Sequence, residues 1–537
     1  MANFIKEAID ILEKEFGYPL SSELKTQSHK IDQGTQLNIL TKDDSVFVCG
    51  LLVGNKMSLD TSGALKKIIS NIPACTLGFI YDGQSIFGFR FKSENSELIK
   101  LREFETYRSP QNSVKGEVFG NQKGQKQLTS LSSNLEATFF QAHSHIRDID
   151  GMHADEALDE LCKIIYTKLF DEEQNTKKMP YKFQRAIYGN ESELATCMHD
   201  LYKEANDYDK RVYSLRIPGY KRSRGVFDHP IKLSASALSK VTEEFERFDL
   251  TSTPLDIKGR AFQNVFLPAL RAGMGQYFTP SPIIELIIKS SNPDSRSLIL
   301  DPFCGSGHFL TESLDFVRSS GAKSKVVDEF AYHKLHGIEK SERMVRVAMT
   351  DMRLHGDGHA NIRCTDALLP FENYHDIEPN SFDYVFTNPP FGSLLGASAI
   401  NSLGEFELAK GRNKVPLEIL GLERAIQFLK SKGKLAIVIP ESILVNGSMQ
   451  YVRDWLADNT TINAIISLPI ETFSPYGANI KTSIVFLKKI KSKSSNKVLC
   501  GKVENIGYDA AGRSLANNDI NSMAVSLREH LCNEGWT

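Results

Sequence analysis

Residues 382–391 read FDYVFTNPPF, and the rest of the chain is organised around this stretch. Its first part, up to Thr387, is a mostly apolar run of β-prone residues, which is typical of a buried strand. The strand has to end at the two prolines, because neither can donate a hydrogen bond to a sheet and each fixes its own φ angle. We therefore predict a buried strand that runs into a rigid loop and places Asn388 at the strand end.

Such a loop suits chemistry on an exocyclic amine. The amino nitrogen of adenine is a weak nucleophile because its lone pair is delocalised into the ring, and two acceptors that hold its hydrogens favour the sp³ state. The amide oxygen of Asn388 and the carbonyl oxygen of Pro389 are candidate acceptors. Phe391 is a candidate stacking partner for a base turned out of a duplex. The alternatives are a proline-terminated strand with a buried Phe, and an enzyme that methylates glutamine in proteins.

A second motif precedes this loop. Residues 297–310, SLILDPFCGSGHFL, predict a short strand that ends at Asp301, a turn with Gly305 and Gly307, and a helix. Glycines in a strand–turn–helix arrangement let the backbone approach a ligand closely, since they carry no Cβ. A third glycine is absent, and this favours adenosylmethionine over a dinucleotide, because there is no pyrophosphate to hold.

Polar residues also follow the next predicted strands. Glu339 can accept hydrogen bonds from two ribose hydroxyls, and Asp366 can accept one from an adenine amine. Each acid alone is also explained as a helix N-cap. Asp301, Glu339, Asp366 and Asn388, each after a strand, are what an open parallel sheet places at its carboxyl edge, where such folds bind ligands.

The remaining patterns complete this part of the chain. A helix is predicted over residues 282–290, capped by Thr279 or Ser281, with proline in its first turn. Further apolar patterns predict a helix and the closing strands of a seven-stranded sheet; they cover residues 416–430, 433–440, 462–468 and 482–487.

Residues 126–270 are predicted to be a helical domain, because apolar residues repeat every three or four positions in 157–169 and 194–202. A basic stretch follows within residues 210–224, where cations alternate with two tyrosines around a Pro-Gly pair. We predict phosphate contacts there, with a solvated loop as the alternative; the cations are Lys210, Arg211, Arg216, Lys221, Arg222 and Arg224.

Residues 1–125 are predicted to form a separate small α/β domain, followed by a polar linker over 105–130. Strand patterns occur at 36–40, 46–53, 76–81 and 86–91, the last two joined by a hairpin turn. The layout resembles the nuclease-like N-terminal domain of type I restriction subunits. That family needs an acid-x-lysine pair on a central strand, and the corresponding stretch, VFVCGLL, has none. The spacing recurs at Glu23 and Lys25, where a loop or a helix start is expected, so a degenerate docking or binding domain is favoured over a nuclease.

Length and composition limit the number of domains and the kinds of partner that we expect for this chain. A length of 537 residues suggests about three domains. The formal charge is −2 and the pI about 6.7, so DNA contact has to come from a local patch or a partner. Eight cysteines without a C-x-x-C pair argue against zinc and fit a reducing cytoplasm. No stretch reaches ~18 apolar residues, so we expect a cytoplasmic protein without membrane or metal contact.

With these motifs in view, residues 150–525 resemble the modification subunit of type I restriction-modification systems, an adenine-N6 DNA methyltransferase. The resemblance includes DIKGRAF at 256–262, QYFTP at 276–280 and GYDAAGR at 507–513. It implies a doubly wound, mostly parallel α/β sheet over residues 271–537 and S-adenosylmethionine as cofactor. The departures are Phe303 and Cys304 in the glycine loop, where small residues are common, and the unusual domain at the N-terminus.

The resemblance also implies roles for single residues. The cofactor would be held by Tyr277, Thr279, Asp301, Phe303, Gly305, Gly307, Glu339 and Asp366. The target base would be held by Asn388, Pro389, Pro390 and Phe391.

The implied partners are duplex DNA, a separate specificity subunit and, in some systems, a restriction subunit. The separate subunit is expected because only about 50 residues follow the last predicted strand, and two copies of this chain per complex are expected. Two other functions stay open. One is a protein or RNA N-methyltransferase, and the other is a non-catalytic or partner-gated DNA-binding subunit of a phage-defence complex.

Overall fold

The computed structural model divides the chain into two compact units, Met1–Lys115 and Gly116–Thr537. The division falls inside the predicted linker, before the boundary predicted at residue 125, and the second unit contains both the helical and the C-terminal α/β regions. The structure describes residues 5, 8–10, 12, 25–31, 34–40, 46–52, 59–70, 77–81, 86–92, 97–100, 118–120, 125–130, 135–175, 180–216, 229–255, 257–259, 261–264, 278–356, 361–374, 376–477, 479–490 and 497–536.

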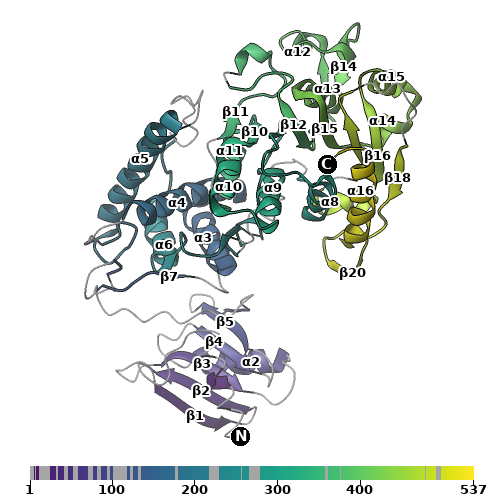
Figure 1. Ribbon diagram of the computed structural model, residues 1–537. Helices are drawn as coiled ribbons and strands as arrows, with labels where there is room; N and C mark the ends of the chain where they lie inside the picture. The colour runs from purple at the N-terminus through teal and green to yellow at the C-terminus, as the bar shows by residue number, and fades with distance from the viewer. Residues whose placement is uncertain are drawn as a thin grey trace. The chain divides into compact units, whose positions relative to one another are not determined.

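The first unit is built on a six-stranded sheet whose strands lie in sequence order (Figure 1). Helix α2 (Leu59–Ser70) connects the only parallel pair among these strands, β3 and β4, and the other neighbours are antiparallel. The antiparallel pairing of β4 with β5 confirms the predicted hairpin. The strands are β1 (Lys25–Ile31), β2 (Gly34–Leu40), β3 (Val46–Leu52), β4 (Leu77–Tyr81), β5 (Ile86–Lys92) and β6 (Glu97–Lys100).

The predicted central strand is confirmed, since β3 lies between β2 and β4 and carries neither an acid nor a lysine. The expectation for Lys25 was wrong. It is the first residue of strand β1 and pairs with Leu40, because the seven residues 25–31 form a complete ladder with β2. Glu23 lies outside the described residues, and the nuclease-like resemblance of this unit stays a prediction.

The second unit begins with a helical region, as predicted. The residues at helical spacing are buried; they include Leu158, Leu161, Ile165, Leu194, Met198 and Leu201. None of the helices in the described part of the chain has the length and apolar character that crossing a bilayer requires. The helices are α3 (Leu135–Asp150), α4 (Ala154–Gln174), α5 (Glu191–Arg216) and α6 (Ala235–Phe245).

The C-terminal region is built on an eight-stranded sheet of order β11-β10-β9-β12-β15-β17-β16-β18. All neighbours are parallel except that β17 runs antiparallel to both β15 and β16. The prediction of seven strands was short by one, because β18 adds a parallel edge strand beside β16. The strands are β9 (Ile299–Asp301), β10 (Leu335–Glu339), β11 (Ile362–Cys364), β12 (Phe382–Thr387), β15 (Leu429–Pro440), β16 (Thr461–Ser467), β17 (Thr482–Lys488) and β18 (Leu499–Lys502).

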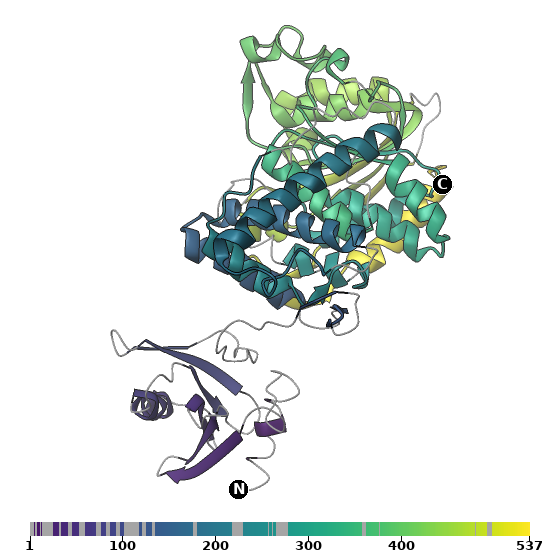
Figure 2. The ribbon, with the colours of Figure 1, turned by 90° about the vertical axis from the view of Figure 1, so that its left-hand side faces the viewer.

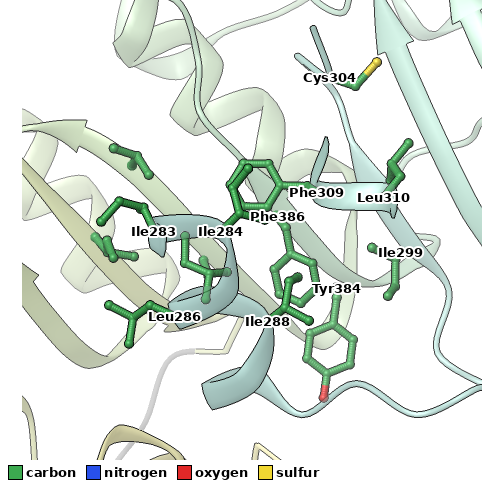
Figure 3. Close-up of a cluster of buried hydrophobic side chains, with 14 of the residues drawn as sticks. Ile283, Ile284, Leu286, Ile288, Ile299, Cys304, Phe309, Leu310, Tyr384 and Phe386 are labelled. Atoms are coloured by element: carbon green, nitrogen blue, oxygen red, sulfur yellow. The ribbon is translucent and has the colours of Figure 1, made fainter. Parts of the chain in front are cut away.

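Both faces of this sheet are covered, because its strands bury alternate residues on opposite sides. Tyr384 and Phe386 join one apolar cluster, whereas Val385 between them joins the other. Figure 3 shows part of the first cluster, where side chains of Ile284, Phe309 and Phe386 meet. The first cluster includes α8 (Ser281–Ser291), α9 (His308–Ser319), α10 (Ser324–His333), α11 (Glu342–Leu354) and α16 (Ile520–Asn533), and the second includes α13 (Leu417–Phe428) and α15 (Gln450–Asn459).

The start of α8 differs from the prediction. Pro280 occupies the N-cap, with φ −61° and ψ 142°, and no side chain caps the helix. Ser281 is already the first helical residue and Thr279 lies before the cap, so neither provides the predicted cap. Pro282 lies in the first turn as predicted, since its missing N–H costs nothing there.

Helix α11 joins the sheet to the helical region through ion pairs with α4. Arg346 donates from Nε to Asp159 Oδ1 at 2.5 Å and from Nη2 to Asp159 Oδ2 at 3.0 Å. Both side chains are buried. Arg343 pairs with Asp155, and Arg353 with Glu173 at 2.7 Å. Figure 2 shows the helices of the helical region lying across the helices that cover the sheet.

We expect Asp159→Ala to lower the stability of the second unit, because it leaves the buried Arg346 charge without its carboxylate. Removing one partner of a buried pair costs about 3–5 kcal/mol. The urea-unfolding midpoint measures this loss. Glu504→Ala, which breaks an exposed pair with Lys502, is the matched control and should barely move the midpoint. Equal midpoints for the two variants would contradict the assignment.

Candidate functional site

The carboxyl ends of four adjacent parallel strands carry the polar residues predicted from the sequence. In the order β11-β10-β9-β12, Asp366 follows β11, Glu339 ends β10, Asp301 ends β9 and Asn388 follows β12. Because these strands are parallel neighbours, the four side chains start from one edge of the sheet. The predicted convergence of these strand ends is therefore confirmed.

Asp301 is the most deeply buried acid of this edge, at 1% exposure. Its Oδ1 atom accepts hydrogen bonds from the Thr387 hydroxyl at 2.6 Å and from the Phe303 backbone N–H at 3.1 Å. Burial raises the pKa of Asp301 to about 7, although both hydrogen bonds favour the ionised form and nearby Glu339 adds to the rise. The carboxyl group therefore changes charge near neutral pH.

The turn after Asp301 has the backbone that its glycines permit. Gly305 has φ +50° and Gly307 has φ +80°, and both lie in the left-handed region. A Cβ at Gly307 would lie 3.2 Å from the Ala348 Cβ, so this glycine also lets α11 approach. The Gly305 N–H donates to Glu339 Oε2 at 3.1 Å, which joins the turn to the end of β10.

Backbone groups hold the other two acids in place. Glu339 also accepts from the Ser341 N–H at 2.7 Å, and burial raises its pKa above the ordinary value. Asp366 accepts from the Leu368 N–H at 3.0 Å and pairs with the exposed Lys340 at 2.8 Å. Both carboxylates retain acceptor capacity, since each oxygen has more than one lone pair.

The loop after β12 contains an acceptor without a donor. Asn388 Oδ1 is buried and makes no hydrogen bond within the described part of the chain. Pro389 is buried beside it, while Pro390 is exposed. Phe391 is only 8% exposed, and its ring packs edge-on against Phe473, with centroids 6.0 Å apart and planes at 85°.

The segment predicted to cover the cofactor is only partly described. Tyr277 lies outside the described residues. Thr279 is half-buried and lies just before α8, and the ring of Phe278 packs into the core of the helical region. A Cβ on Gly305 would lie 3.7 Å from the Phe278 ring, so this segment does pass over the glycine turn.

The basic stretch divides between a helix and residues outside the described range. Lys210, Arg211 and Arg216 belong to α5, so the alternative of a loop was wrong for this part. The helix continues because Tyr208 and its neighbours extend the amphipathic pattern, and Arg211 lies over the Tyr208 ring at 5.7 Å. Lys221, Arg222 and Arg224 lie outside the described residues.

Three site-supporting residues were not singled out from the sequence. Thr387 was read only as a strand residue, yet its hydroxyl binds Asp301. On α13, Glu423 accepts from the Glu407 and Leu408 N–H groups at 2.6 and 2.9 Å, and Arg424 donates to the Leu368 and Leu369 carbonyls at 3.1 Å. The sequence did contain a signal for the last two, since Glu423 and Arg424 are adjacent charged residues in a mostly apolar helix. Buried charges need partners, so such a pair indicates polar contacts with neighbouring segments.

Comparison with known proteins gives the family. The N-6 DNA methylase model matches residues 261–536, just over half of the 537 residues. The methylase subunit of the type I restriction enzyme EcoEI from Escherichia coli is 24% identical over 353 residues, which cover 62% of this chain and 70% of that subunit. The EcoKI methylase subunit of E. coli strain K12 is 29% identical over 227 residues, 41% of each chain.

Solved structures agree on the fold. A chain from a structure of a type I restriction-modification system superposes with a TM-score of 0.56 at 18% identity, covering 76% of this chain and 85% of that one. The type I methyltransferase subunit from Streptococcus thermophilus gives 0.53 at 18% identity, covering 74% and 93%. The match to the family model over residues 261–536 shows that the chain belongs to the N-6 DNA methylase family, as a DNA methyltransferase of the adenine-N6 class related to type I modification subunits.

Proposed function

We propose that the carboxyl edge of the sheet binds S-adenosylmethionine between the glycine turn and the acids, and holds a target adenine of DNA at the loop after β12. Asp301 and the turn at Gly305 would hold the methionine part, Glu339 the ribose and Asp366 the adenine ring of the cofactor. The observation that carries the proposal is the buried Asn388 amide oxygen, which has no donor among the residues that the structure describes. A buried acceptor without a partner is costly, and a ligand amine supplies the missing donor.

The residues present fit this cofactor. Its ribose and amino groups are hydrogen-bond donors, and the three strand-end carboxylates are acceptors. Gly305 has a positive φ, which favours glycine, and because glycine has no Cβ a ligand could approach the backbone of the turn closely. Asp366 would accept from the ligand in place of its contact with Lys340, because an exposed lysine contributes little and is easily displaced.

The mechanism follows from what the loop offers. When bound, the cofactor supplies a methyl group on a positively charged sulfur. Asn388 Oδ1 and the Pro389 carbonyl would accept the two hydrogens of the adenine amine, orient its lone pair and stabilise the positive charge that develops on nitrogen. The stiffness of the two prolines keeps these acceptors fixed during the reaction.

The proposed role of Phe391 requires a movement. Its ring is only 8% exposed and packs edge-on against Phe473, so stacking on a flipped base needs the side chains that cover the ring to move. Enzymes that act on a base take it out of the stack into a pocket lined by aromatic and apolar groups. Phe473 would then line the opposite side of that pocket.

DNA affinity would come partly from outside this site. Lys210 and Arg211 on α5 would contact phosphates together with the other cations of 210–224. A separate specificity subunit would read the sequence, with two copies of this chain in the complex. We propose that Met1–Lys115 is a docking or binding domain with a degenerate nuclease-like fold.

We expect Asn388→Ala to abolish most methyl transfer while leaving cofactor binding intact, because the side chain acts on the amine and not on the cofactor. Loss of one such group lowers turnover on the order of 10²–10³-fold. Transfer of labelled methyl to DNA, RNA and protein, followed by digestion to nucleosides, measures activity and identifies the product. Asn459→Ala, at the exposed end of α15, is the control, and lost cofactor affinity at unchanged turnover would contradict the role.

We expect stability without cofactor to fall as the pH rises from about 4 to about 7, through Asp301. Its native pKa of about 7 lies above the unfolded value of about 3.9, so the native state binds more protons across this range. Asp301→Asn should remove this contribution, and the difference between the two unfolding curves isolates it. Cofactor affinity of the natural protein should rise over the same range as the carboxylate forms. A pH-independent difference would contradict the raised pKa.

We expect the purified chain alone to methylate DNA weakly or without sequence preference, since a separate subunit would read the target. Light scattering gives the mass of the chain and of the complex isolated from its native host through a tag on this chain. A monodisperse monomer that methylates one specific sequence unaided would contradict the proposed partner.

A further inference from the structure

Helix α13 lies directly against the loop after β12, and a glycine marks the contact. A Cβ on Gly421 would lie 2.8 Å from Pro389 Cβ and 3.2 Å from Phe303 Cε2. Pro389 lies in the loop after β12, residues 388–392, which we call the base-holding loop. Phe303 lies in the glycine turn after β9, residues 302–307, which we call the cofactor turn. The position with no side chain is therefore the place where these two loops meet α13.

The same face of the helix makes a second contact one turn earlier. The Leu417 N–H donates to the Ser393 carbonyl at 2.8 Å, and the Gly392 amide lies near enough to the Glu418 carboxylate to favour its ionised form. Glu418 Oε2 is buried and has no hydrogen-bond partner among the described residues. Burial accordingly raises the pKa of Glu418 above its ordinary value. Burying a carboxylate oxygen without a hydrogen-bond donor destabilises the folded protein, so stability does not explain why a glutamate occupies this position.

Glu418 and Gly421 are three residues apart, so they lie on one face of the helix. Along this face the loop runs from Pro389 at Gly421 to Gly392 at Glu418. The neighbours of Gly421 in the helix, Leu420 and Leu422, are fully buried in the core. Glycine is a poorer helix former than the alanine that would otherwise fit a helix interior, so helix stability does not explain it.

We propose that Glu418 and Gly421 are positioning residues, which set the distance between the base-holding loop and the cofactor turn. Gly421 lets both loops approach α13, and the start of the helix holds the far end of the base-holding loop through the Leu417–Ser393 hydrogen bond, with the Glu418 carboxylate beside the Gly392 amide. The inference rests on the proposed function of that loop. Its physical basis is that methyl transfer needs the two reactants in line, and a displacement of about 1 Å costs about 100-fold in rate.

The first test is Gly421→Ala in the tagged complex isolated from the native host, with DNA from a strain that lacks its methylation. Formation of N6-methyladenine gives kcat and KM, and calorimetry gives cofactor affinity. We expect kcat to fall about 100-fold, with a much smaller change in cofactor affinity and in the melting temperature. Gly447→Ala is the matched control, because a Cβ there meets no atom within 4 Å.

The second test separates the polar contact of Glu418 with the loop from its charge. Glu418→Ala removes the carboxylate beside the Gly392 amide and should lower kcat, whereas Glu418→Gln keeps a polar side chain of the same length and should recover most of the loss. Because both positions act through one loop, the double variant with Gly421→Ala should lose less than the product of the single losses.

The outcomes distinguish this inference from the proposed function. If the natural complex forms no N6-methyladenine, the proposed function fails and the inference fails with it. If the natural complex is active and Gly421→Ala retains its kcat, the inference alone is overturned. A loss confined to cofactor affinity or to the melting temperature would also overturn it, because that is the result of a structural role.

Discussion

The hydrogen bond from Thr387 to Asp301 is the contact on which the site depends. It is 2.6 Å long and joins the last residues of two adjacent parallel strands, both almost fully buried. The glycine turn leaves from one end of this bond and the base-holding loop from the other. A buried carboxyl group is tolerated only when it is hydrogen-bonded, so the fold keeps the bond and the two loops start from fixed positions.

The layers around the sheet explain how such a polar edge remains stable. Apolar helices cover both faces of the sheet, so the polar groups of the site gather at the edge where the parallel strands end. There α13 acts as a scaffold, with Glu423 and Arg424 binding two neighbouring loops through backbone groups. Raised pKa values at Asp301 and Glu339 follow from the same burial. Buried acids with raised pKa values in one cluster are typical of active sites.

Much of this arrangement was predictable. The strand ends at Asp301, Glu339 and Asn388 were predicted correctly, because alternating burial and the turn residues leave local patterns in the sequence. The errors were also local. Pro280 is the N-cap of α8 in place of the predicted Thr279 or Ser281, and the cations up to Arg216 continue α5. In these places several local signals compete, and packing against the rest of the unit selects among them.

Local patterns in the chain are enough to predict which acids follow which strands, and that a rigid Asn-Pro-Pro loop follows the strand beside them. Which of these groups touch one another depends on the fold. Thr387 and Asp301 are 86 positions apart, and the contacts of Phe391 with Phe473 and of Pro389 with Gly421 also join distant segments. The physical reason is that periodicity and turn residues act over a few positions, whereas these contacts follow from strand order and from helices packed on the sheet.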